Sequence, residues 1–584
     1  MLIYSTKKLE FNSVKETLAG YCDTDYGKLE AGYIRFYREK IVIEKELDRV
    51  DEALNVMLQT DIRFGEWYPV WEEIKSAKLK NKVLLGIDLY KIAKTLIAAS
   101  QIKEFFVSRN TPAIHEICSQ IHDFEDITRD ILSSIGKEGN VFDKASKELE
   151  SIRDNIRRLK SEIESRLEAI LRRRENEHAI QENIITQREN RYVIPIKKDH
   201  KGKFRGIVLD TSNTGETLFI EPEQIVDKNN ALIEAIHEEQ QEEVKIRRRL
   251  SSYITKRWSA IKESLKAFGK TDLVLAKARY ADKHSCSRPL INENGYWHLR
   301  KARHPALGQK AVPVDMSLGK DFLQLIITGP NTGGKTVCLK TLGILTLMAS
   351  AGLFIPALEQ SEISVVDSIY IDIGDEQSIN QNLSTFSGHI NRIKKILKNA
   401  TLNSLVLIDE LGAGTDPADG AALGVAVLEK LLEKQCRVVV TTHFEQIKNF
   451  AFFSTGVETA SVEFDLETLT PKYRLLMGVA GKSDALLIAK QLGIDENIVK
   501  RAQELQNRGK YSQDELVAEL NKEKTRYLSL MAEAEQMNFE AKKRKKELEQ
   551  KDKELKNLET EIKQGEIYKD RKSTRLNSSH ESPS

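Results

Sequence analysis

The chain has 584 residues, of which 40% are hydrophobic and 30% are charged, and its formal net charge is +2. This length exceeds what one hydrophobic core usually serves, so we expect about three or four folding units, with much of the mass in long solvated helices. The five cysteines lie far apart without a C-x-x-C pair, which argues against a zinc site or a disulfide framework and favours a reducing compartment.

The N-terminal segment MLIYSTKKLEFNSVKETL lacks the apolar core of a signal peptide. No run of about 18 apolar residues, the length that a membrane span needs, occurs in the chain. We therefore expect a cytoplasmic protein without a membrane partner.

The first half of the chain predicts a helical domain followed by a long arm. Residues 1–140 have apolar residues at helical spacing, which predicts an N-terminal helical core domain. Residues 141–183 carry a narrow apolar seam between charges of both signs, so we expect one outgoing helix of about 40 residues and about 60 Å. Residues 184–223 alternate β-branched and polar residues and predict a small β-rich tip. Residues 224–270 predict a returning helix, so the arm, residues 141–270, is expected to be an antiparallel coiled coil.

The second half of the chain has a different residue pattern. Residues 271–320 predict a core helix near 271–282 and the approach to residues 321–510, whose strand-and-turn alternation predicts an α/β domain. Residues 511–569 are heptad-like and then almost wholly charged, which predicts a helical linker. Residues 570–584 have no periodic apolar pattern, so we expect a disordered tail that is foreign to the natural protein.

The octapeptide GPNTGGKT matches the pattern G-x-x-x-x-G-K-[ST] in full, and it lies between a buried-strand pattern and a helical pattern. The glycines free backbone N–H groups to face a triphosphate, while Lys335 reaches the β and γ phosphates and Thr336 ligates Mg²⁺. A chance glycine-rich turn is the alternative, which the complete match and both flanks disfavour. The expected nucleotide-binding residues are Gly329, Pro330, Asn331, Thr332, Gly333, Gly334, Lys335 and Thr336.

A second motif, SLVLIDELGAGTDPADG, has the pattern of a central parallel strand that ends in two carboxylates. We expect Asp409 to hold Mg²⁺ together with Thr336, and Glu410 to orient or deprotonate the attacking water. The next strand, RVVVTTHF, ends in His443, which is either a catalytic contact to the γ phosphate and water or a structural histidine. P-loop, acidic strand and strand plus histidine follow in the order of ABC-type ATPases, so ATP and Mg²⁺ are the expected cofactors. The expected fold is multidomain and mainly α, with an α/β ATPase domain of this P-loop type.

Enzymes of the ABC class hydrolyse ATP across a dimer, so a segment that serves the partner is expected, and DIGDEQSINQNLSTFSGHINRIKKIL is the candidate. Gln377 would be the loop glutamine near Mg²⁺. Ser384 and Thr385 open a helix whose N-terminal hydroxyl and N–H groups would face the γ phosphate of the other protomer. Asp416, in Gly-Thr-Asp, would be a further loop contact. A plain helix N-cap is the alternative for Ser384 and Thr385.

Six basic residues fall within 15 positions around the tip. They predict contact with nucleic-acid phosphates rather than with bases, so affinity should fall steeply with salt and show little sequence preference. Solvated charge on an exposed surface is the alternative. The residues are Arg191, Lys197, Lys198, Lys201, Lys203 and Arg205.

The segments GPNTGGKT, DIGDEQSINQNLSTFSGH, LVLIDELGAGTDPADGAALGVAVLE and TTHF together resemble the ATPase domain of MutS proteins. The GTDPADG variant resembles the MutS-two subfamily of bacteria, and RYVIPIKKDHKGKFRGIV, ARHPAL and other segments extend the resemblance over residues 1–510. It implies a homodimeric ABC-class ATPase whose lever and clamp arms bind branched or structured DNA and suppress homologous recombination. The alternative that it implies is a ribosome-collision sensor that binds ribosomal RNA and splits stalled ribosomes. Either would place the protein in the cytosol, at the nucleoid or at ribosomes.

Two departures from the family pattern matter. The subfamily normally continues into a small MutS-related nuclease domain, and this sequence stops first, so we expect a C-terminally truncated chain for which the resemblance leaves endonuclease activity open. Phe64-Gly65-Glu66 echoes the Phe-x-Glu wedge of mismatch-binding MutS proteins, but its WYPVW neighbourhood lacks the mixed α/β context of a wedge domain. We expect this triplet to serve core packing.

Overall fold

The computed structural model describes most of the chain, and its contacts divide the chain into two units. The first unit comprises residues 1–317 with 340–371, and the second comprises residues 318–339 with 372–584. Among the residues described, no helix combines the length and the apolar character that a membrane span requires. The described residues are 2–3, 6–78, 82–330, 333–374, 382–465, 470–479, 494–507, 526 and 537. The predicted linker 511–569 and tail 570–584 therefore lie outside the description, apart from Arg526 and Met537.

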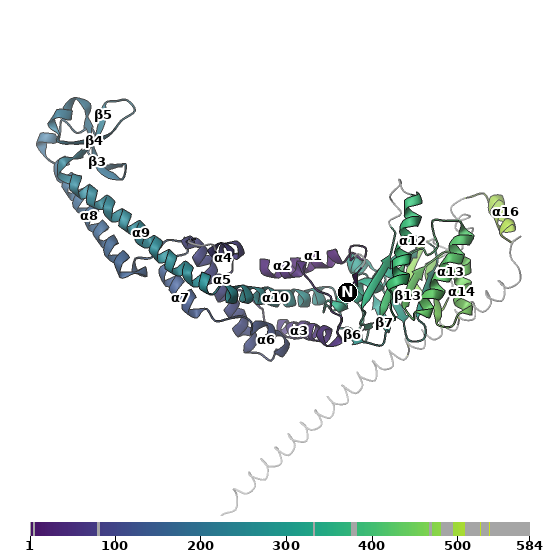
Figure 1. Ribbon diagram of the computed structural model, residues 1–584. Helices are drawn as coiled ribbons and strands as arrows, with labels where there is room; N and C mark the ends of the chain where they lie inside the picture. The colour runs from purple at the N-terminus through teal and green to yellow at the C-terminus, as the bar shows by residue number, and fades with distance from the viewer. Residues whose placement is uncertain are drawn as a thin grey trace, which may run out of the picture. The chain divides into compact units, whose positions relative to one another are not determined.

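The first unit is mainly helical (Figure 1). Its central helix is α10, which has buried residues on all its faces, among them Phe268 and Asp272. The Phe268 ring meets those of Tyr26 and Phe64 edge-on, at centroid distances of 6.0 and 5.4 Å. The helices are α1 (Phe11–Tyr21), α2 (Asp25–Gly32), α3 (Lys40–Gln59), α4 (Trp71–Ala77), α5 (Gly86–Val107), α6 (Pro112–Cys118), α7 (Glu125–Ser134), α8 (Lys147–Leu171), α9 (Val226–Lys256) and α10 (Trp258–Lys283).

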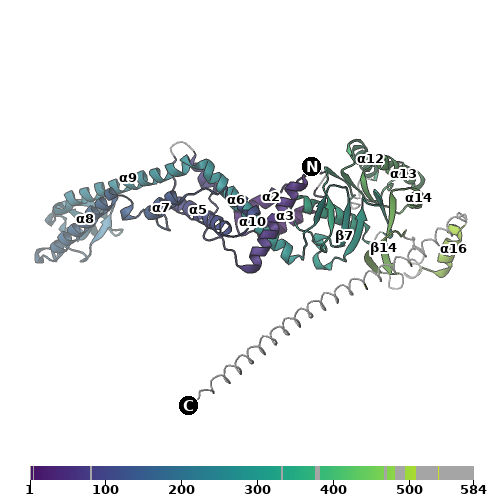
Figure 2. The ribbon, with the colours of Figure 1, turned by 90° about the horizontal axis from the view of Figure 1, so that it is seen from below.

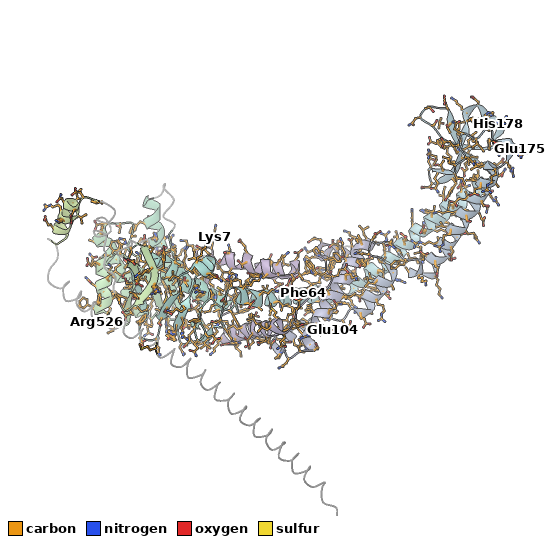
Figure 3. The ribbon with its side chains drawn as sticks, turned by 180° about the vertical axis from the view of Figure 1, so that it is seen from behind. Lys7, Phe64, Glu104, Glu175, His178 and Arg526 are labelled. Carbon is orange, nitrogen blue, oxygen red and sulfur yellow. The ribbon has the colours of Figure 1, made fainter. Side chains whose placement is uncertain are left out.

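Phe64 packs in the interior of this unit, in agreement with the core-packing interpretation of the Phe-x-Glu echo. Its side chain is 5% exposed, and Figure 3 labels it within the helical body, far along the ribbon from Glu175 and His178 at the tip. Glu66 instead faces outward, where it accepts a hydrogen bond from the Tyr68 hydroxyl at 2.6 Å and pairs with Lys94. The phenylalanine therefore has no free face to insert between bases.

Besides the tip, the first unit contains one four-stranded sheet and one parallel pair of strands. β6 (Leu290–Asn292), β10 (Glu362–Ser364), β7 (Trp297–Ala302) and β8 (Val314–Leu318) form one sheet in that order. β1 (Leu2–Ile3) pairs in parallel with β11 (Ser368–Asp372), with Leu2 opposite Ser368. This two-residue strand at the start of the predicted helical core domain 1–140 pairs with a partner more than 300 residues away and has no local sequence signal.

In the arm, α8 and α9 run side by side and carry the tip sheet at their far ends (Figures 1 and 2). Ile156, Ile163 and Leu167 of α8 share one hydrophobic cluster with Leu232 of α9 and with strands of the tip. The tip is a four-stranded antiparallel sheet with the order β2-β3-β5-β4, as the alternating sequence predicted. Its strands are β2 (Thr186–Arg188), β3 (Arg191–Lys197), β4 (Gly206–Thr211) and β5 (Thr217–Pro222).

The helix lengths differ from those expected. α8 has 25 residues, about 38 Å, instead of about 40 residues, because the chain leaves the helix at Arg172 and joins the tip sheet. There Ile180 forms a bridge with Ile196, and the Ala179 carbonyl accepts a hydrogen bond from the Lys197 N–H at 2.9 Å. The returning helix ends at Lys256, and the helix expected near 271–282 is the second half of α10.

The second unit contains an α/β sheet in which β12, β13, β9, β14 and β15 lie in that order. The first four strands are mutually parallel, and β9 and β12 are buried along their whole length, as strands covered on both faces by helices should be. The strands are β9 (Gln324–Thr328), β12 (Ser404–Ile408), β13 (Arg437–Thr441), β14 (Val457–Asp465) and β15 (Thr470–Met477). The helices are α11 (Lys335–Ser350), which crosses the boundary between the units, α12 (Asn382–Asn399), α13 (Pro417–Glu433), α14 (Glu445–Phe453) and α16 (Glu496–Asn507).

Arg153 joins the two helices of the arm, and its removal should destabilise their contact. Its guanidinium is 18% exposed and pairs with Asp143, Glu239 and Glu243 at 2.6 to 2.7 Å. The variant Arg153→Met leaves these carboxylates facing one another, so we expect a loss of about 2 kcal/mol of unfolding free energy and faster amide exchange in α8 and α9. The control is Arg157→Met, since Arg157 is 57% exposed and should matter little. Equal effects of the two variants would contradict the role of Arg153.

Candidate nucleotide site

The loop after β9 has the backbone of a phosphate-binding turn. Gly329 and Gly334 have φ angles of +127° and +90°, which side chains with a Cβ rarely adopt. A Cβ on Gly334 would also lie 2.9 Å from the ring of Tyr473. The loop ends where α11 begins, so the N-terminus of that helix faces the same space. Asn331 and Thr332 lie outside the described residues, while the Gly333 N–H donates to the Pro330 carbonyl at 3.0 Å.

Lys335 lies at the mouth of this loop. Its side chain is 3% exposed, and its Nζ donates to the Gly329 carbonyl at 2.6 Å. Burial lowers the pKa of the ammonium, and the negative charges of Glu410 and Asp409 act in the opposite direction. The lysine is thus held inside the loop, with both carboxylates near enough to stabilise its charge.

Asp409 joins the loop to two strands. Its Oδ2 accepts a hydrogen bond from the Thr336 hydroxyl at 2.8 Å, and its Oδ1 accepts one from the Thr441 hydroxyl. These are hard oxygen ligands of the kind that Mg²⁺ prefers. Among the described residues, no three His, Cys, Asp or Glu side chains cluster as a metal site. Thr336 and Asp409 therefore fit a Mg²⁺ ion that takes its remaining ligands from nucleotide phosphates and water.

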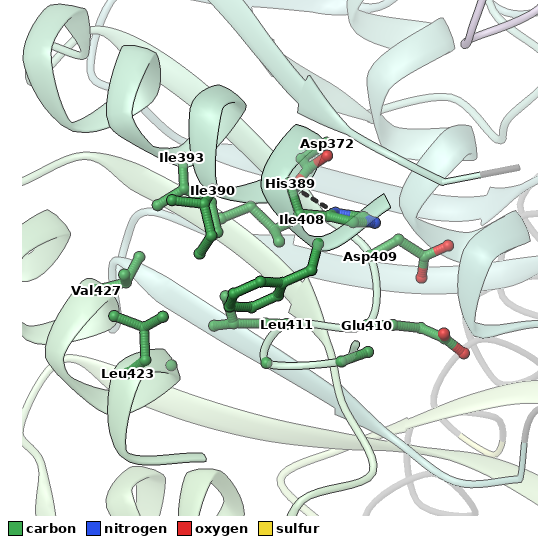
Figure 4. A pocket seen from close by; sticks show the side chains of 14 residues that line it. Asp372, His389, Ile390, Ile393, Ile408, Asp409, Glu410, Leu411, Leu423 and Val427 are labelled. Atoms are coloured by element: carbon green, nitrogen blue, oxygen red, sulfur yellow. Dashed lines mark hydrogen bonds and ion pairs between the residues drawn. The ribbon is translucent and has the colours of Figure 1, made fainter. Parts of the chain in front are cut away.

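Glu410 sits on a strained turn beside Asp409. Its φ of +50° is unusual for a residue with a side chain, and its N–H donates to the Thr441 hydroxyl at 2.8 Å. Figure 4 shows both carboxylates on one side, away from the apolar cluster of Ile390, Ile393 and Val427. The turn thus directs two successive carboxylates to the same edge of the sheet, where alternation along a strand would separate them.

His443 follows β13, and its surroundings favour the neutral form of its imidazole. Burial lowers the pKa of its imidazole below the ordinary value, and the charges of Lys335 and Lys448 lower it further. Its ring lies 4.3 Å from that of Phe444, centroid to centroid. A neutral imidazole can accept a hydrogen bond from a water or from a protonated phosphate oxygen.

Comparison with known proteins shows which family the chain resembles. Residues 325–509 match the family model described as MutS domain V. "Endonuclease MutS2" of Bacillus velezensis is 41% identical over 541 residues, which are 91% of this chain and 69% of that protein. "Putative endonuclease MutS2" of Bacillus subtilis is 41% identical over 536 residues, or 91% and 68% of the two chains. "Endonuclease MutS2" of Caldanaerobacter subterraneus is 40% identical over 502 residues, or 85% and 63%.

The chain belongs to the MutS2 family. The resemblance that the motifs indicated is therefore confirmed, and the α/β domain is of the P-loop ATPase type that MutS domain V represents. Family membership does not assign a role to any single site residue of this chain, so the roles are argued from the geometry of the site.

Three residues that the sequence analysis did not single out organise one side of this MutS2 site. Asp372, at the end of β11, has a fully buried carboxylate that accepts hydrogen bonds from His389 Nδ1 at 2.9 Å and from Arg392 Nε. Figure 4 shows the contact with His389 as a dashed line. The backbone carbonyl of Asp372 accepts the N–H of Asp409 at 2.8 Å. Since His389 and Arg392 belong to α12, this helix is fixed to the strand end that adjoins Asp409. The segment DIGDEQSINQNLSTFSGHINRIKKIL, quoted above as the candidate for serving the partner, contains all three residues, but only as polar letters in an amphipathic pattern.

The segments expected to serve the partner protomer are described only in part. Gln377 lies outside the described residues. Ser384 and Thr385 lie in the first turn of α12, and their side chains lie outside the description. Asp416 is the N-cap of α13, where its carboxylate accepts hydrogen bonds from the N–H groups of Ala418 and Asp419. Its expected role as a loop contact stays a prediction, now beside a structural role.

Thr441 should act as a positioning residue in this site. Thr441→Val removes the hydroxyl that binds both Asp409 and the Glu410 N–H, so we expect kcat for ATP to fall about 10- to 100-fold. KM for ATP should change less than about threefold, because the loop and Lys335 are untouched. Steady-state ATPase kinetics measure both parameters. The control is Thr442→Val, whose buried hydroxyl contacts neither carboxylate, and a matching loss in that variant would contradict the assignment.

Proposed function

We propose that this chain is an ATP hydrolase that works as a homodimer and couples ATP turnover to the binding of branched or structured DNA. The observation that supports the ATPase most directly is the Thr336–Asp409 hydrogen bond of 2.8 Å, which joins the phosphate-binding loop to the acidic strand end. Membership of a family whose ATPase domain matches residues 325–509 supports it independently.

In the proposed reaction, the loop N–H groups and Lys335 bind the β and γ phosphates of ATP, and the lysine exchanges the Gly329 carbonyl for phosphate oxygen. Mg²⁺, held by Thr336 and Asp409, would neutralise charge on the phosphates. Glu410 orients a water and accepts its proton as that water attacks the γ phosphorus, while neutral His443 contacts the same water or the γ phosphate. The bond from the γ phosphorus to the β–γ bridging oxygen breaks, and ADP and phosphate leave. Low exposure of Lys335 strengthens these interactions, because water is excluded from the loop.

Two variants separate binding from hydrolysis at this site. Lys335→Ala removes the ammonium that binds the phosphates and should weaken ATP binding at least about 100-fold. Glu410→Gln keeps the shape of the side chain and should bind ATP normally while kcat falls at least about 100-fold. Nucleotide binding by calorimetry and single-turnover hydrolysis measure the two effects. Normal ATP turnover by Lys335→Ala, with an unchanged thermal unfolding curve, would reject the site.

The homodimer is proposed because α12 offers its N-terminus as a phosphate ligand for a second copy of the site. Ser384 and Thr385 lie in its first turn, where free N–H groups and the helix dipole favour an anion. In this arrangement each ATP lies between Lys335 of one protomer and α12 of the other. ATP then joins the two ATPase domains and hydrolysis releases them.

A mixed dimer tests the composite site. One protomer carries Lys335→Ala and the other carries Ser384→Ala, so one of the two composite sites keeps both wild-type halves. We expect each homodimeric variant to be nearly inactive and the mixture to regain about half of the wild-type turnover per mixed dimer. Absence of any recovery, with mixed dimers shown by differential tags, would argue against hydrolysis across the interface.

Nucleic-acid binding is proposed for the tip of the arm. Lys197, Lys198, Lys201, Lys203 and Arg205 are all exposed there. Arg191 is different, because its guanidinium donates to the buried carboxylate of Glu221 at 2.8 Å, so part of its role is to hold the tip together. Exposed lysines clustered at residues 197–203, in the connection from β3 to β4, suit contact with a phosphate backbone. The arm, as an antiparallel helix pair, would act as the clamp that ATP binding closes.

The salt dependence of binding tests the tip. Replacing Lys198, Lys201 and Lys203 with glutamine should weaken binding to a branched DNA and reduce the slope of log affinity against log salt by about 3. The control variant replaces Lys256, Lys262 and Lys266, which are exposed outside the tip, so both variants lose the same charge. Fluorescence anisotropy across a salt series measures the slope. An equal change in both variants would contradict a specific contact at the tip.

The nature of the nucleic acid is tested by capture. Glu410→Gln should trap the ATP-bound form on its physiological partner, and co-purifying nucleic acid can be sequenced. DNA is the expected result, whereas ribosomal RNA with ribosomal proteins would favour the ribosome-splitting function instead, since both polymers offer the same backbone charge. Endonuclease activity is what the names of the relatives state, and we propose no such step for the residues described.

A further inference from the structure

A polar cavity lies in the first unit, away from the nucleotide loop in sequence. It forms where the C-terminal end of α10 meets the turn at residues 303–309, and its volume is about 250 Å³. One water molecule occupies about 30 Å³ of liquid, so the cavity is large enough for a small organic molecule. The turn carries the Arg-His-Pro of the ARHPAL segment, which the proposed ATPase does not use.

His304 is the most informative residue of this cavity. Its side chain is 4% exposed, yet neither ring nitrogen has a hydrogen-bond partner among the described residues. The Nε of Arg303 is also buried without a partner there. Buried polar groups are nearly always satisfied, by protein, water or ligand, so three unsatisfied nitrogens at one cavity indicate a missing polar occupant.

The positively charged side chains around the cavity favour a negatively charged occupant. Lys283 and Arg303 line it, and none of the ten lining residues is acidic. Glu10 is the acid whose charge acts on the pKa of His304, and its carboxylate is already paired with Lys340 at 2.7 Å. Arginine is a donor only, and a guanidinium with a lysine and an imidazole matches the several oxygens of a phosphoryl group.

The remaining lining suits a small organic group attached to that phosphoryl. Pro305 and Pro356 provide apolar surface, and the rings of Tyr280 and His284 stack at a centroid distance of 4.3 Å. A pocket with a few convergent polar groups and apolar walls is typical of small-molecule sites.

We propose that this cavity binds a small phosphorylated metabolite, with its phosphoryl group held by Arg303, His304 and Lys283. The cavity shares no lining residue with the nucleotide loop, so a phosphate compound would have a second place to bind on the same chain.

The test uses the full chain carrying Lys335→Ala, so that the nucleotide loop does not bind the probes. The probes are inorganic phosphate and ribose 5-phosphate, followed by calorimetry and ³¹P line broadening. We expect saturable binding of both with Kd below about 1 mM, and a loss of at least about tenfold in affinity in Lys283→Gln. Lys283 is exposed, so this variant should fold normally, and His304→Gln should give a loss at least as large. Lys310→Gln, on the same turn but outside the cavity lining, is the matched control and should bind as the parent does.

Each other outcome overturns the proposal. Absence of saturable binding would indicate a cavity filled by water, and equal affinity in Lys283→Gln and the parent would place the phosphate elsewhere. Binding of inorganic phosphate without ribose 5-phosphate would reject a metabolite site. Displacement of both probes by a short DNA duplex would assign the cavity to a nucleic-acid backbone. None of these results depends on ATP hydrolysis, so failure here and failure of the proposed ATPase are distinguishable.

Discussion

The candidate site depends on the hydrogen bonds that the carboxylate of Asp409 accepts. Its two oxygens accept hydrogen bonds from the hydroxyl of Thr336, which is 73 positions away in the chain, and from that of Thr441, which is 32 positions away. Hydrogen bonds to a charged acceptor in a region of low exposure are stronger than neutral ones, and the side chain of Asp409 is largely buried. One charged group therefore sets the distance between the loop, the acidic strand end and the neighbouring strand before any ligand binds. The same Thr441 hydroxyl accepts the Glu410 N–H, so the strained turn that aims the second carboxylate belongs to this network as well.

The parallel sheet could be predicted from the sequence, because its strands are continuous apolar runs that end in polar motifs. Parallel strands present their carboxyl ends at one edge, so the convergence of Lys335, Asp409 and His443 followed from order alone. The arm was harder. Its apolar seam predicts that a helix exists but not where the helix ends. Residues 174–182 are not part of the helix, because Ile180 forms a β-bridge with Ile196 instead. β1 shows the limit of local reasoning, since two residues become a strand only through pairing with Ser368 and Ile369.

Charge is the property that sequence describes least completely. Arg191 counts as a free cation in the sequence, but in the fold it satisfies the buried carboxylate of Glu221. Asp416 counts as a free acid, but its oxygens cap α13. Conversely, His389 and Arg392 appear as ordinary polar positions of an amphipathic helix, and their importance emerges only because Asp372 is buried beside them. The role of a charged residue depends on the group with which it pairs in the folded protein, and that group is usually distant in the chain.

The contacts of Asp372 bear on how a composite site would work. Its carbonyl accepts the N–H of Asp409, and its carboxylate holds His389 and Arg392 of α12. If α12 moved independently of the strand ends, a fully buried carboxylate would lose its partners, which is costly, so the helix and Asp409 should move together. In the dimer that we propose, the N-terminus of α12 serves the ATP of the partner. Each protomer would then present that N-terminus in a position set by its own nucleotide edge, so the two ATP molecules are coupled through one aspartate on each side.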